Sequence, residues 1–181
     1  MRALPTELAG VLIIEPQVFE DERGSFMEVW HLERYRTLGI EASFVQENHS
    51  RSLAGTVRGL HYQLGRPQGK LVRVVQGSVF DVAVDLRRSS PSFGRWLGVS
   101  LSAENRRLLW IPPGFGHGFT PTSAVADVVY LCTEYYAPGE ERTVQWNDPV
   151  LAIPWPLEGR APRVSSKDAR GIPLDRAPVF P

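Results

Sequence analysis

Glycine and proline recur along this chain and divide it into short segments. The 181 residues include 16 glycines and 15 prolines, and a proline inside a helix removes a hydrogen bond and clashes with the preceding turn. Between these breaks lie short runs rich in β-branched and aromatic residues, as is typical of strands. The spacing therefore predicts an all-β sandwich or barrel and argues against long helices.

The expected strands are apolar runs bounded by turn residues. The best helix candidate is Leu32 to Leu38, which Gly39 would end. Residues 50–55 are expected to form a loop. The predicted strands are residues 11–14, 25–30, 44–49, 56–63, 70–75, 79–86, 96–101, 107–111, 118–120, 124–135 and 143–146.

A chain of this length fits a single domain, residues 1–181, with a barrel core at about 40–147. From Asp148 onward prolines become frequent, but Ile153, Trp155 and Leu157 make this segment too apolar for a disordered linker. We therefore expect residues 148–181 to wrap over the barrel as a C-terminal tail, with one short helical turn near residues 165–169.

The charge balance and the cysteine content limit the possible partners. Twenty basic and twenty acidic residues cancel, so the sequence predicts no nucleic-acid partner. No stretch reaches the roughly 18–20 apolar residues of a membrane span, and residues 1–10 lack the apolar run of a signal peptide. Cys132 is the single cysteine, which excludes an intrachain disulfide and favours a reducing, cytoplasmic location.

Polar and charged residues interrupt the apolar pattern of residues 56–63. Arg58, His61 and Gln63 alternate poorly with their apolar neighbours, and Lys70 follows on the next expected strand. If these side chains point into a barrel, they form a shielded polar site, because buried charges are costly unless they are paired or used. The alternative is a solvated strand edge, on which arginine and lysine extend to water.

Pro112-Pro113-Gly114-Phe115-Gly116-His117 has the PxGxxH spacing found in the second half-motif of cupin barrels. Metal cupins supply further histidine and glutamate ligands from the first half-motif, where this chain has His61-Tyr62-Gln63 and later Lys70. A charged lysine has no lone pair for a metal, and a stable site usually needs three protein ligands. We therefore expect no bound metal, although a metal-dependent cupin dioxygenase remains an alternative.

Seven longer motifs lie at residues 21–26, 46–50, 58–63, 68–72, 79–87, 111–119 and 146–149. Together they resemble the dTDP-4-dehydrorhamnose 3,5-epimerase family. The resemblance runs from about Val11 to about Asp168 and implies a cupin-type jelly-roll barrel (double-stranded β-helix) with short peripheral helices. It also implies a homodimer, no cofactor and a dTDP-sugar substrate in dTDP-L-rhamnose synthesis.

The resemblance assigns four catalytic roles. Inverting a carbon next to a ketone needs a base, a group that stabilises the enolate oxygen, and an acid on the opposite face. His61 matches the base, Lys70 the enolate stabiliser and Tyr130 the acid, while Asp168 matches the partner of the histidine. Histidine suits the base because its ordinary pKa is about 6.5. On residue type alone, His61 and Asp168 could equally be structural, and Tyr130 could be a core residue with a satisfied hydroxyl.

Substrate contacts are implied in the same way. Arginine matches the geometry of a pyrophosphate, and Tyr136 matches the aromatic residue that stacks on thymine. A surface charge is the alternative for Arg23 and Lys167, and His31 and His49 are expected to be structural or exposed. The implied substrate-binding residues are Arg23, Glu28, Gln46, Asn48, Arg58, His117, Tyr136, Glu141 and Lys167.

Two positions depart from the common family pattern. Leu131 follows Tyr130 where many members have lysine, and Gly116 precedes His117 where many have alanine. Neither change removes a catalytic group, but both leave other reactions open. The resemblance therefore predicts a 3,5-epimerase, and the alternatives are a 3- or 5-monoepimerase acting on a related dTDP-keto-sugar and a sugar-nucleotide binding cupin without catalysis.

Overall fold

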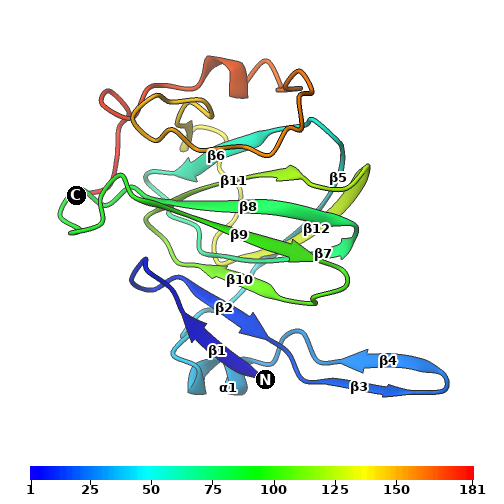
Figure 1. Cartoon of the computed structure of the whole chain (residues 1–181). Helices are drawn as coiled ribbons and strands as arrows, with labels where there is room; N and C mark the ends of the chain where they lie inside the picture. The colour runs from blue at the N-terminus through cyan, green and yellow to red at the C-terminus, as the bar shows by residue number, and fades with distance from the viewer.

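The chain folds into two antiparallel sheets packed face to face (Figure 1). The computed structural model describes residues 1–181 in full. Its elements are β1 (Arg2–Pro5), β2 (Leu12–Glu15), β3 (Val18–Asp21), β4 (Gly24–Met27), α1 (Leu32–Thr37), β5 (Gln46–Leu53), β6 (Arg58–Gln63), β7 (Lys70–Gln76), β8 (Ser78–Asp85), β9 (Trp96–Ser102), β10 (Leu108–Ile111), β11 (Phe115–Pro121), β12 (Val125–Cys132), β13 (Glu141–Thr143) and the 3₁₀ turn η1 (Asp168–Arg170). One sheet has the order β1-β2-β10-β7-β12-β5 and the other β13-β6-β11-β8-β9.

Apolar side chains cover both faces of both sheets. The largest cluster lies between the sheets, a second lies between the five-stranded sheet and the tail, and a third lies under α1. Strand β8 shows the alternation, because Val79 and Ala83 join the first cluster while Val82 and Val84 join the second. Burial on both faces explains why residues 79–86 are apolar with little alternation.

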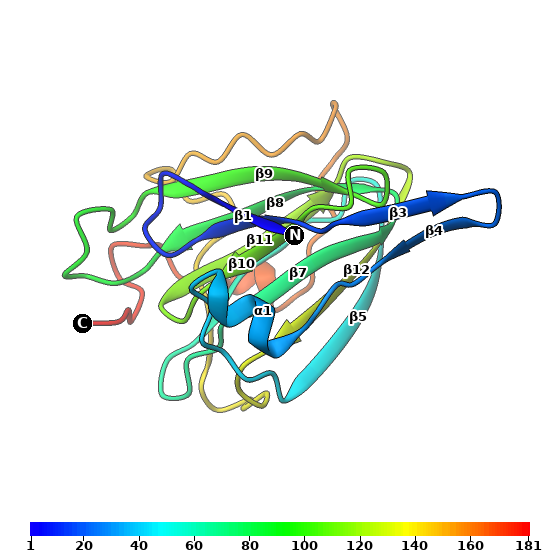
Figure 2. The ribbon, with the colours of Figure 1, turned by 90° about the horizontal axis from the view of Figure 1, so that it is seen from below.

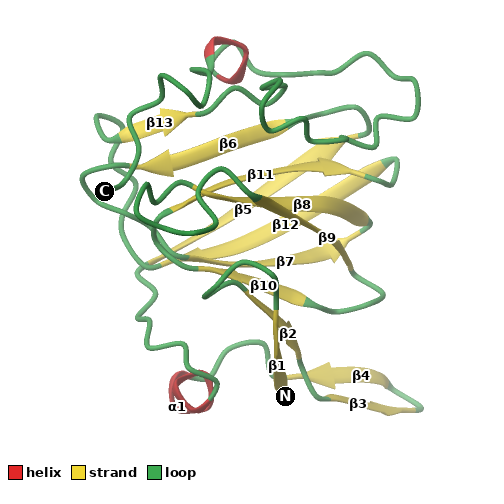
Figure 3. Ribbon diagram, turned by 60° about the vertical axis from the view of Figure 1, so that its left-hand side comes forward, coloured by secondary structure: helices red, strands yellow, loops and turns green.

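The tail packs on the outer face of the five-stranded sheet, as predicted. Leu151, Ile153, Leu174 and Ala177 join the second cluster, and the orange and red segment lies over β6 (Figure 1). The two short helices lie on opposite sides of the molecule (Figure 3). Neither of them has the length or the hydropathy that a membrane-spanning helix requires.

The predicted boundaries hold to within one residue for the helix and fail at several strands. Helix α1 ends before Gly39, whose φ of +83° lets the chain turn. The predicted loop at 50–55 is wrong, because β5 continues to Leu53 and pairs with β12 along its whole length. Its polar sequence reflects its place at the sheet edge. The strand predicted at 25–30 ends at Met27, and neither β1 nor β3 was predicted. The strands predicted at 118–120 and 143–146 are found at 115–121 and 141–143.

The hairpin of β3 and β4 extends away from the two sheets (Figures 1 and 2). Phe19 and Phe26 are register partners on this hairpin, and they are 56% and 69% exposed. An isolated two-stranded hairpin is only marginally stable in water.

Candidate active site

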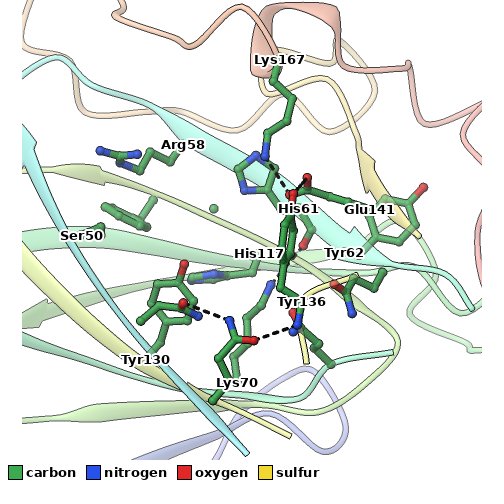
Figure 4. A pocket seen from close by; sticks show the side chains of 16 residues that line it. Ser50, Arg58, His61, Tyr62, Lys70, His117, Tyr130, Tyr136, Glu141 and Lys167 are labelled. Atoms are coloured by element: carbon green, nitrogen blue, oxygen red, sulfur yellow. Dashed lines mark hydrogen bonds and ion pairs between the residues drawn. The ribbon is translucent and has the colours of Figure 1, made fainter. Parts of the chain in front are cut away.

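A cavity of about 350 Å³ lies between the two sheets, and Figure 4 shows the side chains that line it. Strands β5, β7 and β12 supply one wall, whereas β6 and β11 supply the other. The structure thus brings together most of the predicted site. The predicted residues that line the cavity are Gln46, Asn48, Arg58, His61, Lys70, His117, Tyr130, Tyr136, Glu141 and Lys167.

An irregularity in β6 lets Arg58 and His61 face the same cavity. His61 pairs with His117 and Arg58 pairs with Phe119, so three steps on β6 match two steps on β11. Gly59 lies inside this bulge with a φ of +120°, and a Cβ there would lie 2.5 Å from the Cα of Gly118. The close approach of the two glycines therefore permits the bulge that places both polar side chains in the site.

His61 and Asp168 form a hydrogen-bonded pair at one wall of the cavity. Nε2 of His61 lies 2.6 Å from Oδ1 of Asp168. Burial lowers the pKa of His61, and the hydrogen bond to Asp168 opposes this shift. Burial acts to raise the pKa of Asp168, but the His61 ring holds it below its usual value. Asp168 is therefore a carboxylate that accepts from Nε2, which leaves Nδ1 of His61 with a free lone pair.

Lys70 and Tyr130 come from the six-stranded sheet, opposite His61 (Figure 4). The ammonium of Lys70 is buried and donates to the His61 carbonyl oxygen at 3.4 Å. Burial lowers the pKa of Lys70 and raises that of Tyr130. Tyr130 therefore keeps its proton at neutral pH and can act as an acid.

A carboxylate at the cavity mouth joins two further predicted residues. Glu141 accepts from the Tyr136 hydroxyl and from Nζ of Lys167, each at 2.8 Å. Burial would raise the pKa of Glu141, but the two donors hold it below its usual value. Nearby, Nε of Arg58 donates to Oγ of Ser52 at 2.8 Å. Two cationic side chains, Arg58 and Lys167, thus lie at one cavity and can face an anionic ligand.

His117 has a partner that was not predicted from the sequence. Its Nε2 lies 3.0 Å from both carboxylate oxygens of Asp81 on β8, and Asp81 is fully buried. The sequence does contain an indication of this pair, because Asp81 is a charged residue within the apolar run 79–86. A buried charge of this kind needs a partner inside the protein.

Arg23 and Glu28 lie outside the cavity. Arg23 is at the tip of the β3–β4 hairpin, where it pairs with Asp21 at 2.5 Å. Glu28 pairs with Arg34 of α1 at 3.1 Å. His31 and His49 do not line the cavity either. No three His, Cys, Asp or Glu side chains are arranged to hold a metal ion.

The family model described as dTDP-4-dehydrorhamnose 3,5-epimerase matches residues 5–176. The chain is 50% identical to the enzyme of that name from Pseudomonas aeruginosa, with 100% of both chains covered. The chain belongs to the dTDP-4-dehydrorhamnose 3,5-epimerase family. Another member, from Salmonella typhimurium, is 50% identical, with 98% of this chain and 97% of the relative covered.

Solved structures of related epimerases share the fold. The dTDP-6-deoxy-D-glucose-3,5-epimerase of Legionella pneumophila, solved with dTDP-4-keto-L-rhamnose, superposes with a TM-score of 0.93 at 51% identity, covering 97% of this chain and 93% of that chain. A 3'-monoepimerase from Streptomyces bikiniensis, solved with dTDP-quinovose, gives 0.88 at 34% identity, covering 97% and 88%. The predicted all-β, cupin-type fold is therefore confirmed.

Proposed function

We propose that this chain converts dTDP-4-dehydro-6-deoxy-D-glucose to dTDP-4-dehydro-L-rhamnose by inverting C3 and C5, a step of dTDP-L-rhamnose synthesis. The observation that carries the proposal is the arrangement of a histidine–aspartate pair and a protonated tyrosine on opposite walls of one cavity. Inversion needs a base and an acid on opposite faces of the sugar. Binding alone would require neither group.

In this mechanism Nδ1 of His61 removes the proton from the carbon next to the ketone. The electron pair of the C–H bond becomes the C=C bond of the enolate, and the carbonyl π pair moves to the ketone oxygen. The ammonium of Lys70 stabilises the resulting enolate oxygen. Tyr130 then donates its proton to the opposite face of the carbon. Asp168 orients the His61 ring and stabilises the imidazolium. The C3 and C5 protons are both next to the C4 ketone, so the same groups can act twice once His61 has released its proton to solvent and Tyr130 has regained one from it.

The nucleotide would bind at the mouth of the cavity. Arg58 and Lys167 both line the cavity, where they can donate to the pyrophosphate beside their present partners Ser52 and Glu141. Tyr136 is half-exposed and can stack on thymine. Gln46, Asn48, Glu141 and His117 provide the remaining polar contacts in this proposal.

A homodimer would explain the position of Arg23 and Glu28. Both are outside the cavity of their own chain, and the hairpin that carries Arg23 projects with two exposed phenylalanines. We propose that the hairpin packs on a second copy of the chain and brings Arg23 to the pyrophosphate of that copy.

The test is incubation with the keto-sugar in D2O, with deuterium read at C3 and C5 by NMR. A 3,5-epimerase incorporates deuterium at both carbons and yields the L-sugar. Deuterium at one carbon alone would indicate a monoepimerase, and no incorporation would indicate a binding protein.

Dialysis against a chelator separates this proposal from a metal-dependent cupin. Each step above uses only protein side chains, so activity should be unchanged after dialysis. Activity that is lost on dialysis and restored by a divalent metal would contradict the proposed mechanism.

A further inference from the structure

Asp148 is a buried carboxylate that lies outside the cavity and binds three backbone groups. It belongs to the Trp146-Asn147-Asp148-Pro149 motif and is 2% exposed. Oδ1 accepts from the backbone N–H groups of Val150 at 2.8 Å and Leu151 at 3.1 Å. Oδ2 accepts from the N–H of Leu174 at 2.8 Å, 26 residues further along the chain. Asp148 therefore joins the start of the tail to a later part of it.

The tail segment between residues 163 and 174 forms an arch over the edge of the five-stranded sheet. At its upstream end, Arg163 donates to Gly55 at 2.7 Å and accepts from Val57 at 3.0 Å. At its downstream end, Ile172 donates to Thr143 and accepts from Gln145, both at 2.9 Å. The bond from Leu174 to Asp148 lies two residues beyond this second attachment, so Asp148 adds a further hold on the downstream end of the arch.

The arch carries Asp168 to His61. Between the two attachments the chain makes the short turn η1, in which the N–H of Asp168 donates to Oγ of Ser165 at 3.0 Å. Such a short turn has little stability of its own. The position of the Asp168 carboxylate, 2.6 Å from the His61 ring, therefore depends on how firmly both ends of the arch are held.

We infer that Asp148 is a positioning residue for the proposed epimerisation, which it supports by holding the arch that places Asp168 against His61. Only the expected effect of Asp148 on the rate of epimerisation rests on the proposed function. Its effect on the His61–Asp168 pair does not depend on which substrate is turned over.

The substitution Asp148→Asn tests this inference. An asparagine side chain has the same shape but one accepting oxygen, and its amide nitrogen cannot accept from a backbone N–H. Asp175→Asn is the matched control, because the Asp175 carboxylate lies one residue beyond Leu174 and is 70% exposed. Both substitutions are made in the wild-type chain and in an Asp168→Asn variant.

The first readout is the pKa of the His61 imidazole, followed by NMR titration without substrate. The charged groups around His61 are Asp168 and Lys167 of the arch, Lys70 of β7 and Glu141 of β13, with His117 as its register partner. Weakening the contact with Asp168 removes a group that raises the pKa of His61. We therefore expect Asp148→Asn to lower this pKa, and to leave it unchanged when Asp168 is already asparagine.

The second readout is kcat. Because small displacements of a catalytic group cost a large part of the rate, we expect kcat to fall roughly 10-fold or more in the wild-type background and little in the Asp168→Asn background. If Asp148→Asn lowers kcat equally in both backgrounds and leaves the His61 pKa unchanged, the inference is overturned. A wild-type chain that gives no deuterium at C3 or C5 would instead contradict the proposed function, and the NMR titration would still decide the role of Asp148.

Gly171→Ala provides a second route if Asp148→Asn does not fold. A Cβ at Gly171 would lie 2.8 Å from the Cα of Gln145, so the downstream attachment must shift. Gly139→Ala is its control, since nothing lies within 4 Å of the added carbon. Gly171→Ala should lower the His61 pKa and kcat as Asp148→Asn does, whereas Gly139→Ala should change neither. A wild-type His61 pKa and kcat in Gly171→Ala would overturn the inference.

Discussion

At the scale of single residues, the pKa of His61 is set by burial, which lowers it, and by Asp168, which raises it. A base must be neutral to act, so the acid limb of the kcat/KM profile reports the pKa of His61 in the free enzyme. Asp168→Asn removes the raising influence. We expect the acid limb to move to lower pH while the plateau falls by about 10²-fold or more. An acid limb that stays in place, or moves to higher pH, would contradict the assigned pairing.

Tyr130 separates proton removal from inversion. Tyr130→Phe removes the donor and keeps the ring, so folding should survive. His61 can still remove the proton and return it to the original face. We expect product formation to fall by about 10²-fold or more, while some exchange of deuterium at C3 or C5 remains in NMR spectra of the recovered substrate. Full inversion would show that another group is the acid, and complete loss of exchange would assign Tyr130 to binding or enolate formation.

The sequence predicts which residue types meet in the cavity better than it predicts their partners. Arg58, His61 and Lys70 stand out because charged residues interrupt apolar runs. Asp81 interrupts its own run in the same way but was not linked to His117, since the pairing of β8 with β11 determines that contact. Asp168 lies 107 residues from His61, and without the family resemblance nothing in its local sequence indicates the pairing.

At the scale of elements, the close contact of β6 with β11 forms the wall of the site. Gly59→Ala would place a carbon 2.5 Å from the Gly118 Cα and 2.7 Å from the His117 carbonyl oxygen, at a φ of +120°. Because both neighbours are backbone atoms, we expect a loss of unfolding free energy of about 1–3 kcal/mol or more. Thermal unfolding measures this loss, with Gly139→Ala as the control. Equal melting temperatures for the two variants would refute the requirement for glycine.

Local pattern predicted the strands with apolar runs and the short helix but failed at the sheet edges, at β3 and at the start of β11. Strands β7 and β8 are buried on both faces and so carry long apolar runs. Strand β5 is an edge strand with polar, partly exposed side chains, and its ladder with β12 rather than its composition makes it a strand. The bulge at Gly59 likewise depends on the neighbouring strand, so the sequence alone could not place it.

At the scale of the whole molecule, the projecting hairpin predicts a dimer. The exposed Phe19 and Phe26 would be covered by a second chain, since an apolar pair on a lone hairpin is otherwise exposed to water. We expect the chain to be dimeric by light scattering, and the double variant Phe19→Ser/Phe26→Ser to shift it toward monomer and raise KM. Val150→Ser, which removes an apolar side chain that is 74% exposed elsewhere, should change neither. A fully active monomeric wild-type chain would refute the proposed role of the hairpin.

The most direct test of the central claim is deuterium exchange by His61→Asn. If His61 is the base, this variant should bind the dTDP-sugar but lose deuterium incorporation from D2O at both C3 and C5 by at least about 10²–10⁴-fold. Exchange at the wild-type rate at either carbon would show that another group removes that proton and would contradict the account.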